Sequence, residues 1–183
     1  MARNTLSRSL HDVGLSAWFG GTLANAVALN PAAAQAQGEH ATGAVANTGW
    51  DRWTPVNAAA IGLHLVGATG ELFGNKSRVA GQQGVASMAL AKTALTAAAL
   101  GTTAYSRMLG RKVSENTHVQ AASGTEPTAG TPKAVADAQR QLKILQWAVP
   151  ALTGALVVVS SFAGEQQRAS EVHRGIVGRL THG

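Results

Sequence analysis

Four apolar segments, each long enough for a membrane-spanning helix, alternate with polar connections along this chain. A bilayer core of about 30 Å needs roughly 20 apolar residues, because a helix rises about 1.5 Å per residue. The expected spans cover about residues 13–36, 56–73, 85–105 and 145–163. This pattern predicts an all-α fold, a four-helix transmembrane bundle that forms a single membrane domain over residues 1–183.

Charged residues are too few to cover the surface of a soluble domain of this size. They make up 13% of the 183 residues, and hydrophobic residues make up 45%. Soluble domains carry about 25% charged residues, so the composition favours a membrane protein. The mean hydropathy of +0.04 is low for a multi-pass protein because Ala and Gly dominate the apolar segments. A soluble, Ala-rich helical protein therefore stays open as an alternative.

The polar connections predict where the helices begin and end. Residues 37–55 are expected to form a loop, and Pro55 is expected at the entrance of the second helix. Residues 74–84 indicate a short polar turn between antiparallel helices. Residues 110–131 are rich in Ser, Thr, Gly and Pro and lack apolar periodicity, which predicts a mobile polar loop.

The last part of the chain adds two local expectations. Pro150 is expected to kink the fourth helix, because proline removes a backbone donor. Residues 165–183 form a short tail whose apolar side chains share one helical face, with arginines around the other. The apolar side chains are Val172, Ile176, Val177 and Leu180. We expect an amphipathic helix at the membrane surface.

The first apolar segment has a second interpretation as a cleavable signal peptide. Arg3 and Arg8 form a positive start, and residues 34–36 have the small-x-small pattern of a cleavage site. Asn25 and Asn30 interrupt the apolar run, so we expect the segment to be retained as a helix. A secreted, soluble helical protein released after Ala36 stays open.

The net charge of +6 does not indicate nucleic-acid binding, because Lys and Arg stand singly between the apolar segments. Such residues are typical flanks of membrane helices. They divide evenly between the two sides of the predicted bundle. The basic tail suits an anionic cytoplasmic leaflet, so we expect a multi-pass protein of the bacterial inner membrane with both termini in the cytoplasm.

Aromatic and small residues are expected to position the helices. Four aromatic side chains fall at one predicted interface, as anchors in an aromatic belt do. They are Trp50, Trp53, Tyr105 and Trp147. Small residues allow close helix packing in lipid, where apolar contact alone gives helices little reason to associate. The packing candidates are Gly20, Gly21, Gly67 and Gly70.

Polar side chains within the spans form the candidate site. Lys92 has no partner on its own helix, and charge near the middle of a bilayer is costly unless it faces the protein interior. The depth of each residue in the bilayer follows from counting residues from the polar connections, at about 1.5 Å per residue. This places Lys92, His64 and Asn25 near the middle of the bilayer and Glu71 closer to the cytoplasmic end. The four residues predict a site for an ion, a proton or a small ligand. Alternatively, Lys92 pairs with Glu71 or reaches the surface, and Asn25 and His64 form hydrogen bonds between helices.

Cofactor chemistry finds little support in the chain. There is no cysteine, and a b-type haem needs two histidines at similar depth on different helices. His11 and His64 are the intramembrane pair, and the expected spans place them about half a bilayer apart. We therefore expect no cofactor and no metal. No catalytic arrangement stands out, so we expect no enzyme.

The first apolar segment carries a resemblance to known membrane proteins. LHDVGLSAWFGGTLANAVALNPAA contains His11, Trp18, Gly20–Gly21 and Pro31. It resembles the opening helix of small, uncharacterised, actinobacterial-type four-helix integral membrane proteins. It is also similar to the first helix of copper-resistance D-type proteins, which share the His…Trp-x-Gly-Gly spacing. Their further histidines have no counterpart here, so the resemblance implies the architecture and no copper binding.

These observations lead to an expected function. We expect a non-enzymatic accessory or scaffolding subunit that lies in the lipid bilayer and associates with a protein partner or with itself, without nucleic acid. A small transporter or an ion- or proton-conducting protein, using His64, Glu71 and Lys92, is the alternative.

Overall fold

Helices account for most of the structure. The computed structural model describes residues 4–36, 39–82, 84–115 and 121–165. The elements in chain order are α1 (Thr5–Ala24), the π-helical segment η1 (Asn25–Leu29), α2 (Asn30–Ala33), α3 (Glu39–Gly74), α4 (Lys76–Gly81), α5 (Val85–Ser114), β1 (Ala121–Ser123), β2 (Glu126–Pro127) and α6 (Lys133–Glu165).

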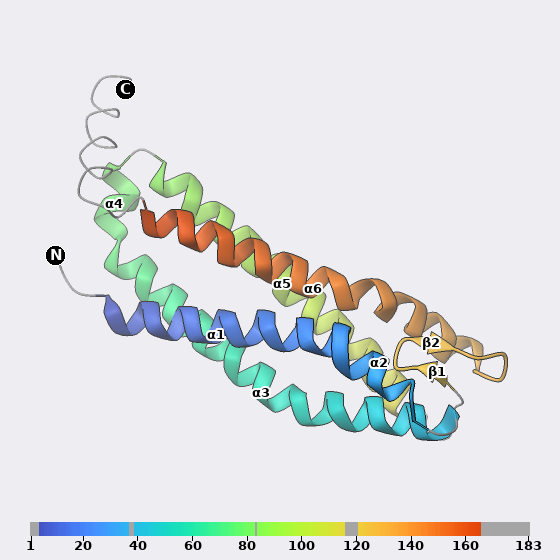
Figure 1. The fold of residues 1–183 in the computed structure, drawn as a ribbon. Helices are drawn as coiled ribbons and strands as arrows, with labels where there is room; N and C mark the ends of the chain where they lie inside the picture. Colours follow the sequence, from blue (N-terminus) through green and yellow to red (C-terminus); the bar gives the residue numbers. More distant parts are fainter. Residues whose placement is uncertain (1–3, 37–38, 83, 116–120, 166–183) are drawn as a thin grey trace.

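The long helices form two side-by-side pairs. In Figure 1, α1 lies along α3 and α5 lies along α6, and α1 also packs against α6. The start of α1, the short helix α4 and the end of α6 lie at one end of the bundle. We call this the α4 end. The antiparallel strands β1 and β2 lie at the opposite end, the hairpin end, beside α2.

The long helices meet around a single indole ring. Trp18 on α1 is fully buried, and its core neighbours are Ala60 on α3, Ala99 on α5 and Val149 on α6. Two of these neighbours are alanines, which leave room for the large side chain. The Trp18 Nε1–H donates to Thr103 Oγ1 at 3.3 Å, so the ring also has a polar partner on α5.

Glycines allow α1 and α3 to pack backbone to backbone. A Cβ atom on Gly67 would collide with the backbone of Ser7 and His11, and one on Gly14 would collide with the backbone of Ala60 and His64. Gly70 lies against Ser7, and Gly21 lies against the ring of Trp53. Gly21, Gly67 and Gly70 therefore occupy packing positions. Gly20 was expected among them and has nothing within 4 Å of its Cβ position.

Within the described residues, three helical segments are long and apolar enough to cross a membrane. They are Ala41–Gly74, Val85–Ser114 and Lys133–Glu165. Large apolar side chains lie exposed along the bundle, as expected for a surface in contact with lipid. They include Leu65, Val66, Leu90, Met108, Ile144, Val158 and Phe162. The all-α fold and the membrane-length helices are thus present. The first helix is not among the three candidate spans.

The second helix begins much earlier than expected. Residues 37–55 were predicted as a loop, whereas α3 is helical from Glu39 and contains Pro55 in its interior. Its buried face continues across the proline, from Ala46 to Asn57. Thr54 Oγ1 donates to the Trp50 carbonyl at 2.8 Å one turn before the proline. Packing on α1 and β1 along this face outweighs the cost of proline, which is about 3 kcal/mol in a helix interior.

The described parts of residues 110–131 contain regular structure where a loop was predicted. Helix α5 continues to Ser114, and β1 pairs with β2 across a tight turn. Gly124 in that turn lies against Asn30 and Ala46, and Ser123 is buried. The turn packs on α2 and α3 through contacts distant in sequence, which apolar periodicity cannot reveal.

The other boundaries also extend beyond the expected spans. Helix α4 occupies most of the expected turn at residues 74–84. Helix α6 includes Pro150, which is buried, and begins at Lys133. The predicted amphipathic tail, residues 165–183, lies outside the described residues except for Glu165.

Candidate functional site

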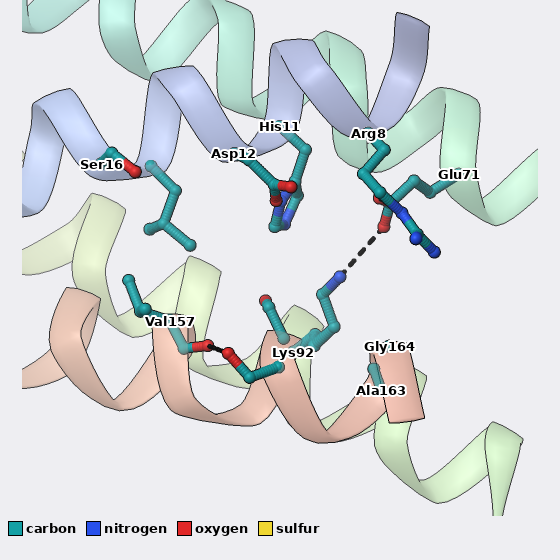
Figure 2. Close-up of a pocket in the computed structure, with 12 residues that line it drawn as sticks. Arg8, His11, Asp12, Ser16, Glu71, Lys92, Val157, Ala163 and Gly164 are labelled. Atoms are coloured by element: carbon teal, nitrogen blue, oxygen red, sulfur yellow. Dashed lines mark hydrogen bonds and ion pairs between the residues drawn. The ribbon is translucent and has the colours of Figure 1, made fainter. Parts of the chain in front are cut away.

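A polar cavity of about 280 Å³ lies between the two helix pairs, toward the α4 end of the bundle. Figure 2 shows side chains from α1, α3, α5 and α6 around it. Its polar lining includes Arg8, His11, Asp12, Glu71, Lys92 and Ser160. We call this the polar cavity.

An ion pair between α3 and α5 forms one wall. Lys92 Nζ lies 3.1 Å from Glu71 Oε2, and the two side chains are 19% and 16% exposed. The guanidinium of Arg8 comes from α1, with Nε 4.0 Å from Glu71 Oε1. Figure 2 shows Lys92 joined to this carboxylate and Arg8 beside it. Glu71 therefore supplies the opposite charge that Lys92 lacks on its own helix. This is the pairing that the sequence offered as the alternative to a site for an ion, a proton or a small ligand.

Two buried histidines meet behind the ion pair. The rings of His11 and His64 have centroids 4.6 Å apart, and both side chains are almost completely buried. The expectation that they lie about half a bilayer apart is wrong. That estimate began the first helix at residue 13, whereas α1 begins at Thr5. The packing of Gly14 and Gly67 then places the two histidines about one helical turn apart in depth. Because the rings contact each other directly, they cannot stand on opposite faces of a haem.

Each histidine has one hydrogen-bonded nitrogen. His11 Nδ1–H donates to Asp12 Oδ1 at 2.8 Å, and His64 Nε2 lies 3.3 Å from Thr96 Oγ1. His11 Nε2 and His64 Nδ1 are buried without a partner among the described residues. Within that part of the chain, no three potential metal ligands from His, Cys, Asp and Glu come together. The cavity lining therefore combines an ion pair with the imidazole of His11, and the ring of His64 contacts that imidazole from behind the lining.

Asn25 does not join this group. It lies in η1, and its Nδ2 donates to the Gly21 carbonyl of its own helix at 2.9 Å. The structure thus brings His64, Glu71 and Lys92 to one region and leaves Asn25 apart. His11 is the member that sequence reasoning missed, because the depth assigned to it was wrong.

A second polar network involves Asn30, which was not among the candidate residues. Its Nδ2 donates to Gln146 Oε1 at 2.8 Å, and its Oδ1 accepts from Trp50 Nε1 at 3.0 Å. One side chain therefore links α2, α3 and α6. The available signal was an asparagine before a proline within an apolar segment.

The expected aromatic anchors divide into two groups. Trp50 is held by Asn30, and Trp53 packs on Gly21, so both indoles face the bundle interior. Tyr105 and Trp147 are exposed, and Tyr105 donates to Gln141. Interfacial anchoring stays a prediction for Tyr105 and Trp147. It does not describe the inward-facing pair.

No protein-family model, curated protein or solved structure matches this chain. The resemblance of the first helix to actinobacterial and copper-resistance proteins accordingly stays a prediction. Ideas about function must rest on the exposed surfaces, the cavities and their polar groups.

Proposed function

We propose that this chain is a non-enzymatic integral membrane protein that acts as an accessory or scaffolding subunit of the bacterial inner membrane. Three membrane-length helices and the exposed apolar side chains support a location in lipid. We place both termini in the cytoplasm because of the basic tail.

The observation that carries this proposal is the exposed surface of α5. In the most apolar stretch of α5, 6% of the residues are buried within the bundle, compared with 22% in the corresponding stretches of α3 and α6. Its exposed face contains Ala94, Ala98 and Gly101, and no described residue lies within 4 Å of the Gly101 Cβ position. Small residues on a lipid-facing helix allow another helix to approach closely. We propose that a partner helix, from another protein or a second copy, packs on this face.

A matched pair of substitutions tests the association. Gly101→Leu on α5 and Gly62→Leu on α3 both replace a glycine with open space around it. Neither should disturb the bundle itself. After mild detergent extraction, the unchanged protein and Gly62→Leu should migrate as a complex larger than a monomer, and Gly101→Leu should dissociate. A monomeric unchanged protein without a co-purifying partner would contradict the proposal.

The buried position of Trp18 bears on the alternative of cleavage after Ala36. Such cleavage would remove α1 and α2, together with the central indole and the polar groups that α1 contributes to the polar cavity. The remaining helices would lose their common core residue. We therefore retain the first helix in the proposed membrane protein and set the secreted form aside as the less favoured hypothesis.

The polar cavity favours one alternative function, a small ion- or proton-conducting protein. The ion pair of Lys92 with Glu71 and the contacting rings of His11 and His64 are groups that exchange protons or bind ions. Proteoliposomes provide the test. Conduction should disappear in Lys92→Met, and a flux that this substitution leaves unchanged would remove the alternative.

A further inference from the structure

A second cavity, of about 300 Å³, lies closer to the hairpin end of the bundle and is distinct from the polar cavity. We call it the amphiphilic cavity. Ile61 on α3, Leu100 on α5 and Val149 on α6 line its inner part, beside the Trp18 core. Trp53, Asn57 and Arg107 also line it, together with Gly124 and Thr125 of the hairpin. Its volume lies at the lower end of the range for small-molecule sites, which is about 300–1,000 Å³.

Three polar atoms on the cavity lining lack partners. Trp53 Nε1, Asn57 Oδ1 and Arg107 Nε are buried and make no hydrogen bond within the described part of the chain. Asn57 is only 9% exposed. Buried polar groups are nearly always hydrogen-bonded, because desolvation without a partner is costly. The residues of the lining thus carry two unpaired donors and one unpaired acceptor close to apolar walls, and a few polar groups among apolar ones are the usual composition of a ligand site.

The charge at this part of the cavity is already compensated. Arg107 donates from both terminal nitrogens to Asp51 Oδ1, at 3.2 and 3.1 Å. The ion pair uses two of the five guanidinium N–H groups, and the buried Nε–H is not one of them. A neutral oxygen acceptor therefore suits the site better than a second carboxylate, which would be repelled by Asp51.

We propose that the amphiphilic cavity binds a neutral, single-chain amphiphile whose head presents a carbonyl oxygen and a hydroxyl. The carbonyl oxygen has two lone pairs and accepts from Trp53 and Arg107. The hydroxyl donates to Asn57 Oδ1. The alkyl chain lies along Ile61, Leu100 and Val149, toward the middle of the bundle. This inference goes beyond the proposed subunit role and does not depend on it.

Tryptophan fluorescence of the full-length protein in detergent tests the proposal with a chain-brominated monoacylglycerol as the probe, because bromine quenches nearby indoles. Trp50 and Trp53 line the cavity. Trp147 is 51% exposed and would respond to any brominated lipid, so the measurements use a Trp147→Phe background. We expect saturable quenching that unbrominated monoacylglycerol reverses. Quenching that rises linearly without saturation would overturn the proposal.

Two variants, one control variant and a charged probe identify the head-group contacts. Arg107→Gln should weaken monoacylglycerol binding by roughly tenfold, as expected for loss of a charge-assisted hydrogen bond. Arg111→Gln removes the same charge from an exposed position one turn along α5, outside the lining, and should bind like the background. Asn57→Ala should also weaken monoacylglycerol binding. It tests the head-group contacts independently if Arg107→Gln folds poorly. Equal affinity in all three variants, or equal binding of a brominated fatty acid, would overturn the proposed head-group recognition.

Discussion

Individual glycines decide how closely α1 and α3 approach. Gly14 and Gly67 contact backbone atoms of the facing helix, which cannot move aside as a flexible side chain can. Gly20 and Gly62 have open space instead. Two glycines in one helix can therefore have opposite roles, and the difference is visible only when the facing helix is in place.

Gly67→Ala should destabilise the bundle, because its Cβ would collide with the backbone of Ser7 and His11. Overpacking of this kind costs about 1–3 kcal/mol. Gly62→Ala adds the same methyl group to the same helix in open space. It should be neutral or stabilising by up to about 1 kcal/mol, because alanine favours helix. Thermal unfolding in detergent measures both. Equal melting temperatures for the two variants would contradict the packing described for Gly67.

The ion pair gives a second prediction at the scale of residues. Glu71→Gln should destabilise the protein more than Lys92→Met, because it leaves Lys92 and Arg8 without their shared carboxylate. In Lys92→Met, Arg8 still lies near Glu71. We expect losses of about 1–3 kcal/mol, below those for a fully buried pair.

A double-mutant cycle in chemical unfolding checks the coupling. Glu71→Gln combined with Lys92→Met should be more stable than the sum of the single losses predicts, because the ammonium that lost its carboxylate is then removed as well. Strictly additive losses would show that the two side chains do not interact.

At the scale of elements, hydrogen bonds between polar side chains fix how the helices are aligned along one another. Apolar contacts alone fix this alignment poorly here. Alanine-rich surfaces offer few large side chains to fix a register. Asn30 meets this need at the hairpin end by bonding to Trp50 and Gln146. The long α3 helix, which continues past Pro55, is what brings Trp50 within reach of Asn30.

Asn30→Ala should therefore loosen the hairpin end of the bundle. It removes two hydrogen bonds between helices and leaves two half-buried partners without them, at a cost of about 1–3 kcal/mol. Asn25→Ala removes one bond within its own helix and should cost less. Thermal unfolding compares the two, and limited proteolysis near residues 121–127 should accelerate in Asn30→Ala alone. Greater instability in Asn25→Ala would contradict the linking role of Asn30.

At the scale of the whole molecule, the apolar exterior predicts behaviour in a membrane. Exposed side chains such as Val66, Leu90 and Phe162 would be unfavourable in water over so much of the surface. The two cavities also lie toward different ends of the bundle, one with an ion pair and the other with apolar walls.

Membrane fractionation with carbonate extraction, followed by intact mass, tests this reading of the molecule. The full-length chain should stay in the carbonate-resistant pellet, because its exposed apolar side chains are stabilised by lipid. A soluble product that begins at Gln37 would instead mean that the first segment is a signal peptide. The bundle built around Trp18 would then not describe the mature protein.

The sequence by itself determined the helical class and the membrane-length apolar segments, because helix periodicity and span length depend on neighbouring residues. It also offered the pairing of Lys92 with Glu71 as one of two interpretations, because both positions are counted from the same connection between helices. The continuation of α3 through Pro55 depended on packing against α1 and β1. Only the tertiary structure decided that His11 contacts His64, because the register of α1 on α3 is set by glycine contacts between residues far apart in the chain.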